Sequence, residues 1–203
     1  MFQIRIHGRG GQGVVTGAEM LSVAAFIEGR HAQAFPSFGS ERTGAPVVAF
    51  CRIADKEIRL REPIQDPDCL ILQDPTLLKV IDVFSGLREN GYVLVNPNKT
   101  FDDLHLRALI EKLPAGHAVI VPATDLALKH VKRPAPNAAL LGAFAALTGL
   151  VHFDSVKRAI AETFPGRIGA ANIAAAQEAY DLVIAQGQLP TGQLAQGPLA
   201  AAV

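Results

Sequence analysis

Near the start of the chain, glycines recur at a spacing that can bind an anion. The segment is Gly8-Arg9-Gly10-Gly11-Gln12-Gly13, which fits the pattern G-x-G-x-x-G. It follows a stretch that alternates apolar and polar like a strand, and it precedes apolar residues at helical spacing. In such a unit the first glycine permits a tight turn, the second lets a ligand approach the backbone, and the third lets the helix pack on the sheet. The amides at the helix N-terminus can then bind a phosphate or a carboxylate.

The dinucleotide-binding form of this motif requires an acidic residue that this sequence lacks. In that fold the second strand ends, about 20 residues after the glycines, in an acid that binds the ribose. Here the second predicted strand ends in Ala34-Phe35-Pro36-Ser37. The sequence therefore argues against NAD and leaves two interpretations open. The glycines form either an anion site, in this chain or at a seam between subunits, or a turn that only packs the helix tightly.

A second polar motif lies in the loop after this strand, Ser37-Phe38-Gly39-Ser40-Glu41-Arg42-Thr43-Gly44-Ala45-Pro46. Adjacent loop charges such as Glu41 and Arg42 are commonly just solvated. However, loops at the carboxyl ends of the first two strands of an open α/β sheet converge on one crevice. We therefore expect Arg9, Glu41 and Arg42 to meet around one anionic group, which Arg can bind with two hydrogen bonds. The candidate binding residues are Gly8, Arg9, Gly10, Gly11, Gln12, Gly13, Ser37, Glu41 and Arg42.

The elements that must position these loops alternate between strands and helices. Predicted strands are 2–7, 31–35, 47–53, 57–61, 69–72, 92–95 and 118–121, and the third and fourth of these are expected to form a β-hairpin. Predicted helices are 14–28, 77–87, 104–113, 137–150, one capped by Asp154 and ended by Pro165 and Gly166, and 170–186. The sequence predicts an α/β fold: a three-layer, Rossmann-like open mixed sheet with an inserted β-hairpin and C-terminal helices.

One domain is expected over residues 1–186, and the remainder differs in composition. Residues 187–203 are rich in Gly, Pro, Gln and Ala and poor in large apolar side chains. Such a segment cannot bury enough surface to fold alone. It is predicted to be a flexible tail or an arm that wraps a partner.

Composition excludes several classes of function. Nineteen basic and 19 acidic residues give a net charge of zero, so no nucleic-acid binding is expected. The two cysteines, Cys51 and Cys69, cannot supply the roughly four thiolates of an iron–sulfur or zinc site, and we expect both to be buried in strands. No histidine pair has metal-site spacing and no nucleophile elbow is present, so no metal site and no catalytic residue is predicted. His7, at the end of the first strand, is the one histidine beside the glycine loop.

The first residues and the apolar content of the sequence suggest where the protein works and that it contacts a partner. The chain begins with a strand-like segment and has no leader-like segment and no apolar run long enough to span a membrane. A cytoplasmic location is therefore expected. The hydrophobic fraction of 49% against 19% charged residues suggests surface that contacts a partner.

The ordered motifs resemble a family. The first strand with its glycine loop and the Ser37–Pro46 loop look like the gamma subunit of 2-oxoacid:ferredoxin oxidoreductases. The resemblance extends over residues 2–182 and includes Gln73-Asp74-Pro75-Thr76-Leu77-Leu78, Asn96-Pro97-Asn98-Lys99-Thr100, Pro136-Asn137-Ala138-Ala139-Leu140-Leu141-Gly142-Ala143 and Phe164-Pro165-Gly166. One departure is Thr43, where many relatives carry a second basic residue.

The resemblance implies a role in an assembly. Such complexes convert a 2-oxoacid and coenzyme A to acyl-CoA, carbon dioxide and two electrons. Thiamine diphosphate and Mg²⁺ lie between alpha- and beta-type subunits, and [4Fe-4S] clusters lie in beta- and delta-type subunits. Ferredoxin or another acceptor receives the electrons through the partner subunits. The gamma-type chain would bind none of these cofactors alone and would be inactive in isolation. It would contribute subunit contacts and part of the coenzyme A site, while pyruvate, branched-chain and aromatic 2-oxoacids all stay open as substrates.

Three hypotheses follow: a subunit that binds part of coenzyme A, a purely structural interface subunit, and a free-standing nucleotide-binding oxidoreductase. The first predicts that Arg42→Ala weakens coenzyme A binding to the intact complex and leaves the thiamine content unchanged. The measurements are a coenzyme A titration and a thiamine assay. If the variant loosens subunit assembly before it alters the affinity for coenzyme A, the structural hypothesis is favoured instead.

Overall fold

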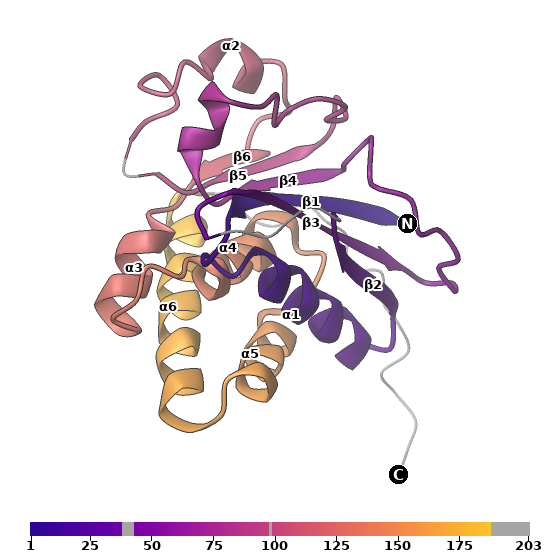
Figure 1. Ribbon diagram of the computed structural model, residues 1–203, viewed down its shortest axis with the longest axis vertical. Helices are drawn as coiled ribbons and strands as arrows, with labels where there is room; N and C mark the ends of the chain where they lie inside the picture. The colour runs from indigo at the N-terminus through magenta and orange to yellow at the C-terminus, as the bar shows by residue number, and fades with distance from the viewer. Residues whose placement is uncertain (38–42, 98, 188–203) are drawn as a thin grey trace.

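The computed structural model describes residues 1–37, 43–97 and 99–187. Six strands form one sheet in the order β2-β3-β1-β4-β5-β6 (Figure 1). The strands are β1 Phe2–Arg9, β2 His31–Pro36, β3 Pro46–Ala54, β4 Cys69–Leu72, β5 Tyr92–Val95 and β6 Ala118–Ile120. β1, β4, β5 and β6 pair in parallel, whereas β3 pairs antiparallel with both β1 and β2. The predicted mixed sheet is confirmed.

Most helices cover one face of this sheet, below it in Figure 1. They are α1 Val14–Ile27, α3 Ala123–His130, α4 Asn137–Thr148, α5 Phe153–Thr163 and α6 Gly166–Ala185. The other face carries the 3-10 helix η1 Pro75–Lys79 and the short helix α2 Arg107–Ile110, with irregular chain around them. The third layer is therefore thin. Its core is a small cluster of buried residues on β4, β5 and the segment between them: Leu70, Leu72, Leu77, Val83, Val93 and Val95.

The α4 helix lies at the centre of the larger core. All twelve of its residues are buried, as the continuous apolar sequence predicts. It packs chiefly on α6, and the two helices approach closely at Gly142 because a Cβ there would lie 2.0 Å from the carbonyl oxygen of Ala176. The α1 helix also matches its prediction, with Val14, Ala18, Leu21 and Ala25 buried.

The predicted hairpin partner of β3 is wrong. Residues 57–61 form no strand, and four of these five residues are exposed. Both edges of β3 are already paired, one with β1 and the other with β2, so no edge is left for a further strand. The hairpin is instead β2–β3, inserted between α1 and β4. Residues 60–62 lie beside Arg52 of β3, which donates hydrogen bonds to the carbonyl oxygens of Leu60 and Glu62 at 3.4 and 2.6 Å.

Four helix predictions also need correction. Residues 77–87 contain only the end of η1, and residues 104–113 contain only the four-residue α2. Their apolar side chains pack on the part of the sheet formed by β4 and β5 and do not form one stripe along a helix. The α5 helix has His152 rather than Asp154 at its N-cap, and Asp154 pairs with Lys157 at 2.6 Å. The α6 helix begins at Gly166, directly after the turn at Phe164 and Pro165 that ends α5.

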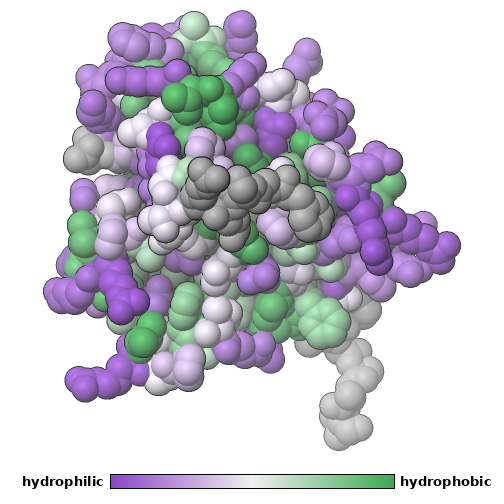
Figure 2. Space-filling model, in the orientation of Figure 1, coloured by the Kyte–Doolittle hydropathy of each residue, from purple (hydrophilic) through white to green (hydrophobic). Residues whose placement is uncertain are grey.

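The surface mixes polar and apolar residues (Figure 2). Among the described residues, the exposed large apolar side chains are Met1, Phe26, Leu60, Val80, Leu128, Ile168 and Leu182, which are scattered along the chain. No helix in this part of the chain is long and apolar enough to cross a bilayer. The tail predicted at 187–203 lies outside the described residues except for Gly187.

The packing at Gly142 predicts an asymmetric response to adding one methyl group. Gly142→Ala forces the backbones of α4 and α6 apart and should lower the free energy of unfolding by about 2 to 3 kcal/mol. Gly17→Ala is the matched control, because its new Cβ would lie 3.5 Å from the nearest atom, Cβ of Asn137. Alanine in a helix interior is favoured over glycine, so this variant should gain about 0.5 to 1 kcal/mol. Urea unfolding of both variants measures the difference, and equal stabilities would contradict the close α4–α6 contact.

Candidate functional site

The glycine loop lies at the carboxyl end of β1, where the sequence places it, but its glycines differ in role from the prediction. Gly8 is still inside the strand, paired with Val47 of β3. A Cβ on Gly8 would lie 2.6 Å from Cγ2 of Val14 and 3.1 Å from Oε1 of Gln73. Gly8 therefore allows α1 and the end of β4 to approach β1. The tight turn after the strand lies further along the chain.

The turn depends on Gly11 and Gly13, which have φ of 94° and 73°. Both values lie in the left-handed region that glycine adopts without strain. Gly13 is also the N-cap residue of α1, and a Cβ there would lie 2.5 Å from Nδ2 of Asn137 at the start of α4. The third glycine therefore fits against a helix rather than against the sheet.

The second predicted loop meets the glycine loop. Gly10 forms an isolated bridge with Thr43, its amide donates to the carbonyl oxygen of Ala45 at 2.9 Å, and Gly44 donates back to Gly10 at 3.1 Å. The predicted convergence of the two loops is confirmed at this end. Glu41 and Arg42 lie outside the described residues, so their part in the site stays a prediction. Ser37 is exposed, and its amide extends the β2–β3 ladder by donating to Val48.

Arg9 contacts its own chain. Its Nε and Nη2 donate to Oγ1 of Thr76 at 3.1 and 2.8 Å, and its Nη1 donates to the carbonyl oxygen of Gly44 at 2.9 Å. It also forms an ion pair with Asp74 at 3.3 Å. Arg9 thus joins the glycine loop, the end of β4 and the second loop, which is a positioning role that the sequence prediction did not include.

Gln12 completes this connection. Its Oε1 accepts from the amide of Arg9, and its Nε2 donates to Asp74, each at 2.8 Å. Burial alone would raise the pKa of Asp74, but hydrogen bonds from Thr76 and Gln12 and the charge of Arg9 outweigh burial and hold the pKa below its ordinary value. The carboxylate is therefore charged at neutral pH and keeps the loop in one shape.

Polar residues at the ends of the next strands extend the network. Asn96, after β5, donates from Nδ2 to the carbonyl oxygen of Gln73 at 2.7 Å and to Oγ1 of Thr124 at 2.8 Å. The amide of Thr124, in the first turn of α3, donates to Oδ1 of Asn96 at 3.0 Å. The sequence reasoning did not assign Asp74, Thr76, Asn96 or Thr124 to the site. Their signal is a polar residue one to four positions after the end of a parallel strand.

A cavity of about 490 Å³ opens beside the glycine loop. Its walls include Arg9, Gly10, Gly11, Gly13, Thr16 and Thr43. The first turn of α1 carries no acidic residue, so its unpaired amides and the positive end of the helix dipole are not neutralised there by a side chain. The cavity can therefore accept an anionic group.

The strand order separates this cavity from that of a dinucleotide-binding domain. In the dinucleotide fold the strand beside β1 is parallel to it and carries the ribose-binding acid at its carboxyl end. Here β3 occupies that place and runs antiparallel, and β2 lies one strand further out. Two features therefore argue against NAD: the missing acid at the end of the second strand, and the antiparallel direction of the strand beside β1.

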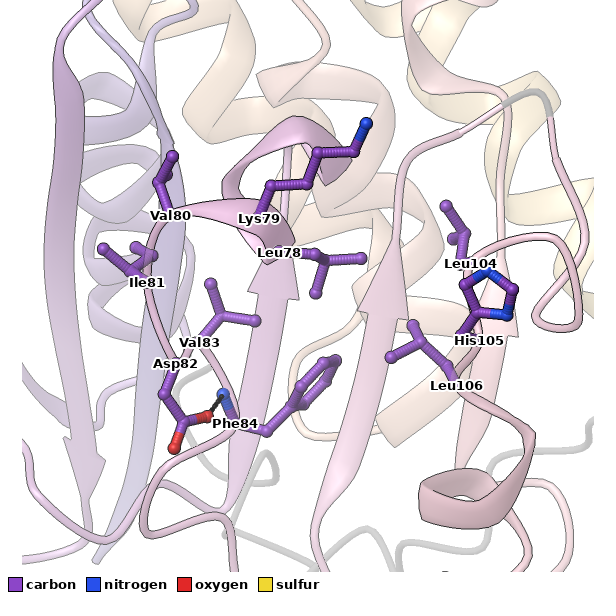
Figure 3. Close-up of a pocket in the computed structure, with 10 residues that line it drawn as sticks. All are labelled: Leu78, Lys79, Val80, Ile81, Asp82, Val83, Phe84, Leu104, His105 and Leu106. Atoms are coloured by element: carbon purple, nitrogen blue, oxygen red, sulfur yellow. Dashed lines mark hydrogen bonds between the residues drawn. The ribbon is translucent and has the colours of Figure 1, made fainter.

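A second cavity, of about 550 Å³, lies on the thin face of the sheet (Figure 3). The segment after β4 supplies one wall with Leu78, Ile81 and Phe84, and the segment after β5 supplies the other with Leu104 and Leu106. The amide of Phe84 donates to Asp82 at 3.3 Å. The lining is mostly apolar and contains no pair of titratable groups in contact, so it offers no catalytic arrangement.

The part of the chain that the structure describes contains no group of three or more His, Cys, Asp or Glu side chains able to hold a metal ion. Cys51 in β3 and Cys69 in β4 are both fully buried, as predicted. Burial raises the pKa of Cys51 to about 12 and also raises the pKa of Cys69. Both thiols are therefore protonated and unreactive at neutral pH.

Comparison with known proteins agrees with this geometry. The family model described as pyruvate ferredoxin/flavodoxin oxidoreductase matches residues 3–182. The chain belongs to this family. It is 48% identical over 184 residues to the pyruvate/ketoisovalerate oxidoreductases common subunit gamma of Thermococcus litoralis, covering 91% of this chain and 98% of that protein. It is 49% identical over 181 residues to the pyruvate synthase subunit PorC of Methanothermobacter marburgensis, covering 89% and 97% of the two chains.

The crystal structure of the pyruvate oxidoreductase subunit PORC of Thermotoga maritima has the same fold. The TM-score is 0.74 at 38% identity, and the match covers 89% of this chain and 95% of that one. The matched relatives are thus spanned almost end to end. The resemblance noted in the sequence is confirmed, and the fold is that of the family's gamma subunits.

His7 is the histidine of β1 nearest the glycine loop, and it is 5% exposed. Within the described part of the chain, neither ring nitrogen has a hydrogen-bond partner. Burial, and secondly the charge of Arg5, lowers the pKa of His7 from its ordinary 6.5 to about 4. The ring is therefore neutral in the folded protein at neutral pH.

This burial predicts a pH dependence of stability. The unfolded chain takes up a proton on His7 near pH 6.5, whereas the folded chain does so only near pH 4. The free energy of unfolding should therefore fall as the pH drops from 6.5 to 4, by about 3 kcal/mol in total from this group. In His7→Leu this contribution to the pH dependence disappears. Chemical unfolding at pH 7 and pH 4.5 measures the free energy of unfolding of both proteins and shows the difference. His31→Gln, at an exposed position, is the control, and a His7→Leu profile parallel to wild type would contradict the assignment.

Proposed function

We propose that the chain is the gamma-type subunit of a multisubunit 2-oxoacid oxidoreductase that forms acyl-CoA, and that its glycine-loop cavity binds part of coenzyme A. The family match over residues 3–182 and two relatives near 48% identity named as subunits support the first part. The cavity beside the first turn of α1 supports the second, because it presents backbone amides to an anion with no competing carboxylate in that turn.

Other subunits supply the redox chemistry in this proposal. Two buried, protonated cysteines cannot bind an iron–sulfur cluster. Thiamine diphosphate, Mg²⁺ and [4Fe-4S] clusters are therefore assigned to alpha-, beta- and delta-type partners, and ferredoxin or another acceptor to a site on those partners. The complex is proposed to work in the cytoplasm, with pyruvate or another 2-oxoacid as substrate.

The role of this chain is to bind and orient. Amides of Gly11, Gly13 and the first turn of α1 would donate to a phosphate group in the cavity. The network of Arg9, Gln12, Asp74 and Thr76 would hold those amides in place before the ligand arrives, which lowers the entropy cost of binding. Candidate contacts from Ser37, Glu41 and Arg42 belong to the same proposal.

One observation favours the alternative of a purely structural subunit. The guanidinium group of Arg9 is occupied by Thr76, Gly44 and Asp74 and is not directed at an empty anion position. In this alternative the glycine loop only shapes a subunit interface. The two functions make different predictions for a charge placed inside the cavity.

Thr16→Asp tests the ligand role. Thr16 lines the cavity from the first turn of α1. The helix dipole favours a carboxylate at this position, so the substitution should not destabilise the fold. An anion about 5 Å away would be repelled, so coenzyme A binding to the intact complex should weaken by roughly tenfold or more. Isothermal titration with coenzyme A, and with pantetheine as a ligand that lacks the phosphates, measures the effect.

The control is Thr16→Asn, which has the shape of Asp without its charge. It should bind coenzyme A nearly as wild type does, and neither variant should change pantetheine binding. Equal affinity of Thr16→Asp and Thr16→Asn for coenzyme A would remove the ligand role. Loosened assembly of Thr16→Asp at unchanged affinity, seen by native mass spectrometry, would favour the structural alternative.

A further inference from the structure

The β2 strand forms an edge of the sheet. In the described part of the chain the order is β2-β3-β1-β4-β5-β6, so β2 has β3 on one side and no strand on the other. β6 forms the opposite edge and is only three residues long, Ala118–Ile120. β2 has six residues, His31–Pro36. An open strand edge of this length presents unpaired backbone groups to another strand.

The ladder with β3 determines which backbone groups point outward. Ser37 donates its amide to Val48, and the register pairs Phe35 with Phe50 and Gln33 with Arg52. In an antiparallel pair, hydrogen-bonded residues alternate with residues whose amide and carbonyl point away from the partner. Ser37, Phe35 and Gln33 therefore face β3. Ala32 and Ala34 turn their amides and carbonyls to the open edge.

The edge lacks the usual protection against pairing. Natural edge strands carry charged side chains, bulges or prolines that block a neighbour. His31-Ala32-Gln33-Ala34-Phe35-Pro36 contains no Lys, Arg, Asp or Glu, and its register with β3 is continuous from His31 to Pro36. The only proline is the last residue of the strand, beyond both outward alanines.

Gln33, between the two alanines, has an unmet hydrogen bond. Its Oε1 is buried, and within the described residues it has no donor. A buried acceptor without a partner costs about 1 to 3 kcal/mol. Because this oxygen is enclosed in the isolated chain, the side chain would have to turn outward to accept a hydrogen bond from a neighbouring strand.

We propose that β2 pairs with β2 of a second copy of this chain, antiparallel about a two-fold axis that passes beside Gln33. Ala32 of each copy then exchanges both backbone hydrogen bonds with Ala34 of the other, which gives four bonds across the axis. Gln33 faces Gln33 of the second copy in the close, non-hydrogen-bonded position. Once the two side chains turn outward, the amide group of one can donate to the Oε1 of the other, and the two sheets become one.

A second copy of β2 fits this edge because the strand is self-complementary in this antiparallel register. The flanking pairs bring His31 opposite Phe35 and Arg30 opposite Pro36, so no like charges face each other in this register. An isologous contact of this kind closes as a dimer and cannot propagate. The glycine-loop cavity is not part of the contact, so the inference does not depend on coenzyme A binding.

Ala34→Pro tests the pairing in the full-length chain. Proline removes the outward amide of Ala34 but no amide that donates to β3. Ala34→Val is the control, because valine is close to proline in size and keeps the amide. Sedimentation equilibrium should show a dimer for wild type and for Ala34→Val, with a dissociation constant at least about tenfold weaker in Ala34→Pro. Circular dichroism checks that all three chains are folded.

A disulfide reports the register. Across the axis the Cα atoms of a close pair are about 4.5 Å apart, within the range that a disulfide can bridge. Gln33→Cys should therefore cross-link into a dimer under mild oxidation. In His31→Cys the two thiols lie about 13 Å apart, so that variant should stay uncross-linked. The native thiols give no background because Cys51 and Cys69 are fully buried.

Three results would overturn the proposal. A wild-type chain that is monomeric at every concentration up to about 100 μM, well above the affinity of a specific dimer, shows that the copies do not pair. A dimer that Ala34→Pro leaves intact, or that His31→Cys traps as well as Gln33→Cys, uses another surface or register. Amide exchange at Ala32 and Ala34 that is slow and independent of concentration shows that the edge is covered within one chain.

Discussion

Two side chains of the glycine loop, Arg9 and Gln12, converge on Asp74 and Thr76 at the end of β4. The loop has no regular ladder of its own beyond β1, and two of its glycines adopt left-handed conformations that only glycine takes without strain. The charged Asp74 carboxylate accepts from Gln12 and pairs with Arg9, so it fixes the loop at two of its side chains, while Thr76 in η1 holds the carboxylate itself. The shape of the cavity and the direction of its amides depend on this contact. The bridge between Gly10 and Thr43 then places the second loop on the other side of the same cavity.

The antiparallel strand β3 has two consequences for the molecule. It takes the position beside β1 that a dinucleotide-binding domain gives to an acid-bearing parallel strand, which removes the ribose site. It also moves β2 to the edge of the sheet, where its outward backbone groups have no strand partner among the described residues. A single insertion in the strand order therefore replaces the strand that bears the ribose-binding acid in a dinucleotide fold, and it leaves β2 at the edge of the described sheet.

The apolar composition is explained mostly by the interior. The twelve buried residues of α4, together with parts of α1, α5 and α6, form the larger core between the sheet and the helices. The exposed large apolar residues are separated along the chain, so the composition by itself does not identify a contact surface. The thin layer still covers β4 and β5, which are buried along almost their whole length, whereas β2 has no fully buried residue.

The sequence alone determined what depends on local spacing. The helix pattern of α1, the continuous apolar runs of α4, β4 and β5, and the strand–glycine–helix unit could all be predicted, because burial imposes a period that local residues display. The ordered motifs also identified the family. Strand partners could not be derived in this way: residues 57–61 alternate like a strand but find no free edge, since β3 is paired on both sides. The tertiary structure likewise decided that Arg9 binds Asp74, 65 positions away, and that Gly13 fits against Asn137 of α4. These contacts join residues distant in the sequence, and only the folded sheet brings them together.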